Sequence, residues 1–241
     1  LYERAGIKAI FQGGEDHGIA GVSFNAYANY KESWGAKFSR VVSCNTTGLV
    51  RTLYPLDKEI GVERVSATIV RRGADPSDNK GSALNSLEPS LKLPTHHGPD
   101  VQTIMPWINI TTMAVKSPTT LMHLHCVIAD LKKEVKESDV LAAWDDVSRV
   151  RLVSGKRGLK GTANIMELAK DLDRPRGDFM EIAVWQDGIK VVGKTLYYYQ
   201  AVHQESDVVP ENIDCIRSMM KMEPDASRSI KKTDTSLGIG E

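Results

Sequence analysis

The sequence has no excess charge of either sign, few cysteines and no long apolar run. Its 241 residues include 31 Lys and Arg against 31 Asp and Glu, so the formal net charge is zero. Proteins that bind nucleic acids usually carry a basic excess to neutralise phosphates, and its absence argues against such a partner. The longest weakly charged stretch, residues 101–115, contains polar residues and is too short to span a membrane.

Only three cysteines are present, Cys44, Cys126 and Cys215, and none belongs to a CxxC pair. An odd number without paired spacing favours a reducing, cytoplasmic compartment. Apolar residues make up 41% of the sequence, which excludes a disordered chain. The length fits one large domain or two modest ones. Because the first residue is Leu1 and not Met, we expect this to be a piece of a longer chain.

The first part of the sequence has the pattern of a parallel α/β fold. Short apolar runs at residues 8–11, 22–25 and 40–43 predict buried strands separated by loops. Residues 49–54 predict a helix that Pro55 stops or kinks. Strands and a helix in this order are typical of a parallel sheet.

Longer alternating segments follow and predict a second architecture. Strands are expected at residues 62–72, 119–131, 181–185, 189–192 and 196–202, with a hairpin turn at Asp187-Gly188. A long polar loop, residues 73–95, separates the first of these strands from the rest. This pattern indicates an antiparallel sheet with helices on one face.

Three helices are predicted in the second half. One covers residues 138–146 with Ser138 as its N-cap, and another covers residues 162–172. The third begins at Pro210, and the tail from Glu223 onward is polar. The apolar stripe expected on this third helix consists of Ile213, Ile216, Met219 and Met220.

Cys44 is the strongest candidate for a reactive group. It follows a predicted strand and begins a helical segment, where unpaired N–H groups and the positive end of the helix dipole lower the pKa of a thiol. Asn45, Thr46 and Thr47 add donors suited to an oxyanion or a phosphate. The alternative is an ordinary small buried cysteine, which is the interpretation for the other two cysteines.

A reactive thiol needs a partner for its proton, and alternation places His123 and His125 on one face of a predicted strand, roughly 6.5–7 Å apart. The opposite face carries Met122, Leu124, Cys126 and Ile128 and is interpreted as core. The two imidazoles are then expected to face solvent or a cleft. The alternative is that both rings are structural.

Two further groups could bind an anion. His96-His97 lies in a loop, where contact with a substrate is favoured over a metal site because no third ligand has useful spacing. Arg71-Arg72 ends a long strand and could hold a phosphate, or could be a pair of surface charges.

These residues occur in blocks that resemble the archaeal type of phosphorylating glyceraldehyde-3-phosphate dehydrogenase. The blocks extend nearly from end to end. They include Phe11-Gln-Gly-Gly-Glu, Val22-Ser-Phe-Asn-Ala, Ser43-Cys-Asn-Thr-Thr-Gly-Leu, Thr95-His-His-Gly-Pro-Asp, Pro118-Thr-Thr-Leu-Met-His-Leu-His and Ala201-Val-His-Gln-Glu-Ser-Asp.

The resemblance implies an oxidoreductase in which Cys44 is the nucleophile and forms a thioester, while His123 is the base. It implies a triose phosphate and inorganic phosphate as substrates, NAD or NADP as cofactor, no metal, and a homotetramer. By the same resemblance, Ser43, Asn45, His96 and His97 contact the substrate. The implied contacts on the cofactor side are Gly14, Arg72 and Gln204.

The implied fold is α/β and α+β: a partial Rossmann NAD(P)-binding domain joined to a catalytic domain, whose mixed sheet is implied only by the resemblance. Residues 1–43 would belong to the cofactor domain, residues 44–203 to the catalytic domain, and residues 204–241 to a segment that returns to the cofactor domain. No GxGxxG motif follows an opening strand. In the family this motif lies upstream of the position matched by Leu1.

Three hypotheses therefore compete. The first is the NAD(P)-dependent dehydrogenase. The second is a truncated fragment without dehydrogenase activity, which acts only as a substrate-binding or assembly module, and the missing pyrophosphate loop motivates it. The third is a Cys–His hydrolase that uses the same thiolate without a nicotinamide.

Overall fold

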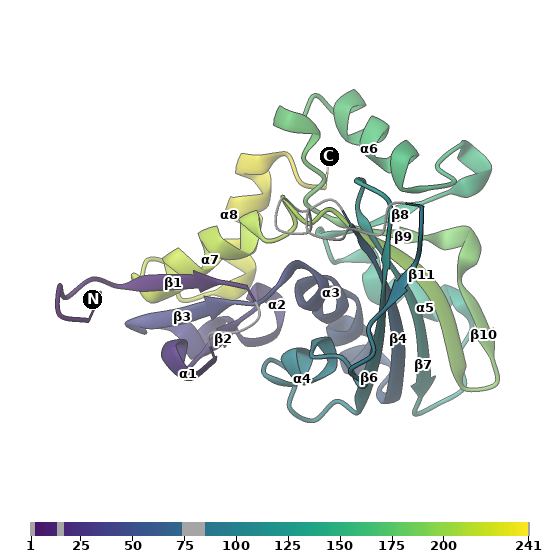
Figure 1. The fold of residues 1–241 in the computed structure, drawn as a ribbon. Coiled ribbons are helices and arrows are strands. Elements are labelled where there is room, and N and C mark those ends of the chain that lie inside the picture. Colours follow the sequence, from purple (N-terminus) through teal and green to yellow (C-terminus); the bar gives the residue numbers. More distant parts are fainter. Residues whose placement is uncertain (1–2, 14–16, 74–84, 241) are drawn as a thin grey trace.

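A computed structural model describes residues 3–13, 17–73 and 85–240, which form two sheets of different size (Figure 1). The smaller is parallel, has the order β1-β3-β2, and consists of β1 (Ala9–Gln12), β2 (Ser23–Phe24) and β3 (Phe38–Val41). Short helices α1 (His17–Ala20) and α2 (Ala26–Asn29) lie in its connections. The predicted parallel strands are confirmed, with boundaries shifted by up to two residues.

The larger sheet is mixed. Its order is β5-β6-β4-β7-β11-β9-β8, and β10 pairs with β11. β4 pairs antiparallel with β7 and parallel with β6, and β8 pairs parallel with β9. Its strands are β4 (Val62–Arg72), β5 (Glu88–Pro89), β6 (Ile110–Ser117), β7 (His123–Leu131), β8 (Val150–Val153), β9 (Ile182–Trp185), β10 (Lys190–Val192) and β11 (Thr195–Val202).

This sheet differs from the pattern-based prediction in its strands, their direction and one turn. β5, β6 and β8 were not predicted as strands, and the pairs β4–β6 and β8–β9 are parallel where an antiparallel sheet was predicted. The hairpin at Asp187-Gly188 is wrong, because β9 and β10 do not pair with each other. The hairpin instead joins β10 to β11 through Gly193 and Lys194, and Gly193 has a φ of 59°, which favours glycine.

Four helices accompany this sheet: α3 (Cys44–Glu59), α4 (His97–Gln102), α5 (Glu137–Asp145) and α6 (Thr162–Asp171). The predicted stop at Pro55 is wrong, since α3 continues through it. Leu53 and Leu56 lie on either side of Pro55 and are both fully buried, so packing holds the helix together where one backbone hydrogen bond is lost. Ser138 is not the N-cap of α5. Lys136 takes that position, and its N–H donates to Asp139 Oδ2 at 2.8 Å.

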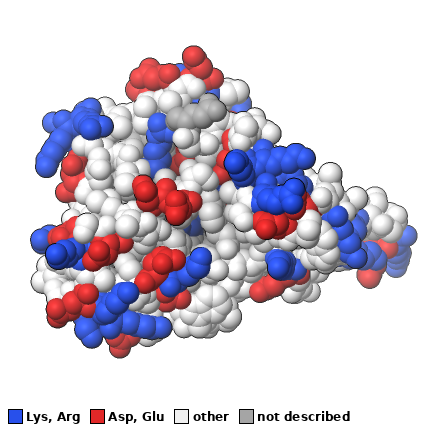
Figure 2. All heavy atoms as spheres, turned by 180° about the vertical axis from the view of Figure 1, so that it is seen from behind, with Lys and Arg blue, Asp and Glu red and all other residues white. Residues whose placement is uncertain are grey.

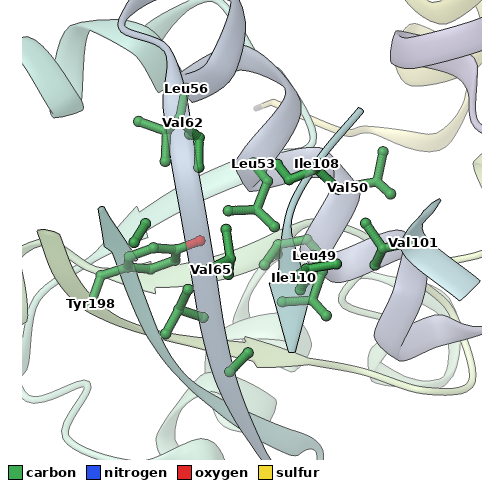
Figure 3. Packing of buried hydrophobic residues seen from close by; sticks show 14 of the residues in the cluster. Leu49, Val50, Leu53, Leu56, Val62, Val65, Val101, Ile108, Ile110 and Tyr198 are labelled. Carbon is green, nitrogen blue, oxygen red and sulfur yellow. The ribbon is translucent and has the colours of Figure 1, made fainter. Parts of the chain in front are cut away.

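The main core lies between α3 and the inner face of the larger sheet. Leu49, Leu53 and Leu56 of α3 pack against Val62 and Val65 of β4 (Figure 3). α5 joins the same core through Val140 and Trp144. A separate cluster forms where α6 packs with Ala183 and Ala201, at the far end of the sheet. The core therefore fixes α3, and with it the position of Cys44.

The last two helices, α7 (Val209–Met219) and α8 (Ala226–Leu237), return to the smaller sheet (Figure 1). Cys215, Met219 and Ile230 pack there against Val41. The predicted stripe on α7 is wrong in part, because Ile216 and Met220 are exposed. The buried side carries Glu211, Asp214 and Ser218, whose partners come from distant segments. The polar tail that the sequence predicted contains α8.

Charged side chains of both signs are interspersed on the face shown in Figure 2, around a large uncharged region. This distribution matches the balanced composition. In the part of the chain that the structure describes, no helix has the length and apolar character needed to cross a membrane.

Candidate active site

Cys44 is the first residue of α3 and follows β3 directly. Ser43 is the N-cap of this helix: the Thr46 N–H donates to Ser43 Oγ at 3.5 Å, and the two hydroxyls lie 3.0 Å apart. The hydroxyl of Ser43, predicted to contact substrate, therefore caps the helix in this structure. The strand–Cys–helix arrangement around Cys44 is as predicted.

A buried ion pair holds the start of α3 in place. Thr46 Oγ1 donates to Asp100 Oδ2 at 2.5 Å, and Arg40 Nη1 donates to Asp100 Oδ1 at 2.6 Å. Arg40 belongs to β3 and Asp100 to α4. The first turn of α3 is thus tied to the smaller sheet and to α4, so that Cys44 stands where these elements meet.

The predicted depression of the Cys44 pKa is wrong for this structure. Burial raises the pKa of the Cys44 thiol, and the nearby Asp207 raises it further. The Asn45 N–H, Arg71 and Arg72 act in the opposite direction but do not prevail. Loss of hydration of the thiolate outweighs the favourable helix end. Without bound substrate, Cys44 is therefore a thiol at neutral pH.

His123 begins β7 and is 1% exposed. Its Nδ1 accepts the Arg72 N–H at 3.0 Å, so the proton of a neutral ring resides on Nε2. Met122, the preceding residue, has a φ of 59°, a conformation that costs a side-chain-bearing residue about 1 kcal/mol. The strand begins directly after this residue, and the His123 ring contacts the end of β4.

The predicted orientation of the histidine face is also wrong. His123 and His125 are both buried, whereas Leu124 and Cys126 are half-buried and Ile128 is 43% exposed. The imidazoles can occupy the interior because each finds hydrogen-bond partners there. Leu124, Cys126 and Ile128 lie on the open face of the sheet instead, whereas Met122 is buried as predicted.

His96 and His97 lie at the start of α4, with their rings stacked at a centroid distance of 4.0 Å. His96 is exposed, while His97 is buried and its Nδ1 lies 3.1 Å from Thr95 Oγ1. Burial, together with the charges of His96, Arg71 and His123, lowers the pKa of His97 to about 3. These interactions bring His97 and His123 into one site, where His97 is neutral.

The two arginines at the end of β4 have different surroundings. Arg72 Nε donates to Gln204 Oε1 at 3.1 Å, and its Nη1 donates to the Thr120 carbonyl at 3.2 Å and pairs with Glu205. Arg71 has a buried Nε that lacks a hydrogen-bond partner among the described residues. Arg71 therefore has donor capacity beside Cys44 and His97, a role that the sequence left open.

The residues predicted to face the cofactor are brought together only in part. Arg72 and Gln204 are in direct contact, as stated above, while Gly14 lies outside the described residues. Gln12, at the carboxyl end of β1, accepts a hydrogen bond from Asn212 Nδ2 at 2.6 Å. The carboxyl ends of parallel strands are where open α/β sheets bind ligands. Within residues 3–13, 17–73 and 85–240, no cluster of three or more metal-binding side chains occurs.

Asp207 is a further site residue that the sequence did not indicate. It is fully buried, and neither carboxyl oxygen has a hydrogen-bond partner in the described part of the chain. The Val208 N–H lies near the carboxyl without meeting hydrogen-bond geometry. Burial raises the pKa of Asp207 well above its ordinary value, although Arg51 opposes this effect. Only its position in the folded chain reveals this group.

Replacing Asp207 with asparagine is expected to change how stability depends on pH. The native carboxyl keeps a proton that the unfolded chain releases above about pH 4, so the free energy of unfolding falls as pH rises through the native pKa. Asp207→Asn removes this loss and should be more stable at pH 8 by about 1 kcal/mol or more. Urea unfolding at pH 4.5 and 8 measures the change in the free energy of unfolding between the two pH values. The exposed Asp145→Asn variant is the control and should show the same change as the wild type. If Asp207→Asn also showed the wild-type change, the prediction would be contradicted.

Comparison with known proteins gives consistent similarities. A family model described as the C-terminal domain of glyceraldehyde 3-phosphate dehydrogenase matches residues 43–188. The chain is 56% identical over 240 residues to the glyceraldehyde-3-phosphate dehydrogenase of Methanococcoides burtonii, which covers 99% of this chain and 71% of that protein. Identity to the enzyme of Methanobrevibacter smithii is 52%, with the same coverage. For Picrophilus torridus it is 50% over 239 residues, covering 99% of this chain and 70% of that protein.

Proposed function

Because this chain belongs to the glyceraldehyde-3-phosphate dehydrogenase family, we propose that it oxidises D-glyceraldehyde 3-phosphate to 1,3-bisphosphoglycerate through a thioester on Cys44. The observation that carries this proposal is the placement of Cys44 at the start of α3, where the charges of Arg71 and Arg72 act on it. Arg71 also acts on His97, and His97 is within range of His123. A thiol with nearby donors and cations is suited to attack an aldehyde that carries a phosphate.

In the proposed first step the Cys44 sulfur adds to the aldehyde carbon, negative charge develops on the carbonyl oxygen, and the thiol proton ends on that oxygen to give a hemithioacetal. The geometry of His123 favours a hydrogen-bond donor role here. Its Nδ1 is occupied by the Arg72 N–H, so Nε2 carries the proton of the neutral ring and can donate a hydrogen bond to this oxygen. To act as a base toward the thiol, His123 would need an Nε2 without a proton and therefore a proton on Nδ1. A proton on Nδ1 would face the Arg72 N–H, which is itself a donor and cannot accept a hydrogen bond.

The phosphate groups of the two substrates are proposed to bind at Arg71 and the two histidines. The buried Nε of Arg71 supports this assignment, because an unpaired guanidinium donor is stabilised by an anion. His97 is neutral there and would contribute a hydrogen bond and not a charge. Inorganic phosphate then attacks the thioester carbon, the C–S bond breaks, and Cys44 is released.

The residues present fit the nicotinamide end of NAD or NADP. Gln12 and Asn212 supply amide groups at the carboxyl end of β1, and Arg72 and Gln204 supply a guanidinium and an amide group at the carboxyl end of β4. When bound, the nicotinamide supplies the acceptor for the hydride that leaves the substrate carbon. The sequence contains no GxGxxG motif for the pyrophosphate.

An assay with both cofactors tests the proposal. We expect reduced nicotinamide to form only when D-glyceraldehyde 3-phosphate is present, and to continue beyond one equivalent per Cys44 only when inorganic phosphate is added. Without phosphate, the intact protein should gain the mass of one acyl group. Absence of both product and acyl adduct would reject a dehydrogenase function for this chain.

The second hypothesis, a substrate-binding or assembly module, retains one specific support, the missing pyrophosphate motif. Calorimetric titration separates the two. Stoichiometric binding of NAD or NADP would reject the module, whereas binding of the triose phosphate alone would favour it. For the domain organisation we propose that residues 1–43 and 204–241 form one unit, which the packing of α7 and α8 on the smaller sheet supports. The free cysteines support a reducing compartment, and we propose the cytoplasm.

We further propose a homotetramer in which the open face of the larger sheet is covered. On this face Met113, Thr68, Cys126 and Tyr199 form one row across four strands. Met113 and Tyr199 are about half exposed, and Ile128 and Tyr197 in the next row are 43% and 41% exposed. A contiguous apolar patch of this kind is typical of a subunit interface.

Charge on this face should break the assembly. Light scattering after size exclusion is expected to give a mass four times that of one chain for the wild type, and a smaller assembly for Ile128→Glu/Tyr199→Glu, because a buried carboxylate without a partner is costly. Lys232→Glu, at an exposed position of α8 outside this face, is the control and should keep the wild-type mass. A monomeric wild type at micromolar concentration would contradict the proposal.

A further inference from the structure

A chain of buried hydrogen bonds connects the residue after Cys44 to the interior of the protein. Asn45 Oδ1 lies 2.9 Å from His125 Nε2, and His125 Nδ1 lies 3.0 Å from Gln200 Nε2. Gln200 Oε1 accepts from Thr52 Oγ1 at 2.8 Å, and Thr52 Oγ1 lies 3.1 Å from the Tyr198 hydroxyl. Asn45 is 5% exposed, and the other four residues are at most 1% exposed.

The chemistry of these groups gives the chain a direction. The amide nitrogen of Gln200 can only donate, so His125 Nδ1 accepts and the proton of the neutral ring lies on Nε2. That proton is donated to Asn45 Oδ1, which leaves the amino group of Asn45 on the opposite side. Burial lowers the pKa of His125 well below its ordinary value, so the ring stays neutral. No hydrogen bond to Asn45 Nδ2 occurs among the residues that the structure describes.

Gly48 allows this chain of hydrogen bonds to include Asn45. A Cβ at this position would lie 2.7 Å from Val202 Cγ2, 3.4 Å from Gln200 Nε2 and 3.5 Å from His125 Cε1. The absence of a side chain on this turn of α3 therefore allows the helix to pack close to β7 and β11. The close approach brings the first turn of α3 within hydrogen-bond distance of His125.

We propose that His125 and Gln200 are positioning residues that hold the Asn45 carboxamide with its amino group toward the substrate oxygen at Cys44. This inference rests on the proposed function. When the Cys44 thiol adds to the aldehyde carbon, a C–S bond forms, the S–H bond breaks and the π electron pair moves to the carbonyl oxygen, which then takes up the thiol proton. A fixed amide donor stabilises that negative oxygen, and the loss of one such donor typically lowers kcat by about 10²–10³-fold. If the amide rotated, it would present its own oxygen and repel the charge.

Kinetics of variants at both ends of this contact test the proposal. Asn45→Leu removes the donor, and His125→Leu removes the group that orients it, so each should lower kcat by at least about tenfold while KM for the triose phosphate changes much less. His125→Gln should restore most of kcat, because its amide nitrogen takes the place of Nε2. Adding His125→Leu to Asn45→Leu should cause no further loss. Gln102→Leu, which removes a hydrogen bond from a glutamine at the far end of α4, is the control and should leave kcat unchanged.

Losses that multiply in the double variant, or an effect of His125→Leu on KM alone, would overturn the proposal. Nitrogen NMR of the His125 ring provides a second measurement that needs no activity. The wild type should show a neutral ring protonated on Nε2, and protonation on Nδ1 would also overturn the proposal. If the wild type forms no reduced nicotinamide, the proposed function fails, while the NMR measurement of the His125 ring still decides whether His125 donates to Asn45. The same NMR measurement tests the proposal if His125→Leu does not fold.

Discussion

Cys44→Ser is expected to lower the rate of reduced nicotinamide formation by at least about 10³-fold. A serine hydroxyl at this buried position ionises far less readily than a thiol, and an oxygen ester is a poorer acyl donor to phosphate than a thioester. The fold should be retained, since the side chains are nearly equal in size. Initial rates at saturating substrate and phosphate measure the effect.

The matched control for this variant is Cys126→Ser. Cys126 is half-buried on the open face of the sheet, away from the start of α3, and its replacement should leave the rate unchanged. Mass spectrometry without phosphate gives an independent readout, in which the wild type and Cys126→Ser gain one acyl group and Cys44→Ser gains none. Activity of Cys44→Ser within tenfold of the wild type would show that no thioester lies on the reaction path.

Glu211→Gln is expected to have the largest effect on stability, a loss of about 3–5 kcal/mol. Glu211 Oε1 accepts from Arg51 Nη2 at 2.8 Å and from Arg149 Nη1 at 3.1 Å, and all three side chains are fully buried. Its Oε2 accepts from the Ala26 N–H at 2.7 Å. Burial acts to raise the pKa of Glu211, but the two arginines outweigh it and lower the pKa. A neutral amide there would leave two buried guanidinium groups short of one negative charge.

The measurement is equilibrium unfolding in urea at pH 7 with conditions held constant. Glu167→Gln is the matched control, since Glu167 pairs with Lys170 on the surface of α6 and exposed pairs contribute little. Because the native pKa of Glu211 is lowered, its contribution is present at neutral pH and should fade in acid, which narrows the difference between wild type and variant there. A loss below about 1 kcal/mol at pH 7 would show that the cluster is not needed for stability.

The ion pairs of Glu211 with Arg51 and Arg149 explain why the sequence prediction for the buried side of α7 was wrong in part. Helical periodicity located the helix and Pro210 at its start, but it assigned the buried side to apolar residues. The buried side carries Glu211 and Asp214 because Arg51 and Arg149 reach it from elsewhere in the chain. Periodicity measures hydrophobicity along one segment and contains no information on a charge supplied by another.

β7 shows the same limit. Alternation correctly placed His123 and His125 on one face of the strand and Leu124 and Cys126 on the other. The prediction of which face is buried was wrong. Burial of the histidines depends on the Arg72 N–H, Asn45 and Gln200, which come from three other elements. The exposed apolar face is the one for which we propose a partner subunit.

By itself, the sequence determined what depends on neighbouring residues. Strand followed by helix start is a local pattern, so the position of Cys44, the parallel strands before it and the family followed from the order of residues. Only the tertiary structure decided the raised pKa of Cys44, the tautomers of His123 and His125, and the unpaired groups of Arg71 and Asp207. Each of these depends on burial and on partners distant in the chain, because the free energy of a charge or a proton is set by what surrounds it in space.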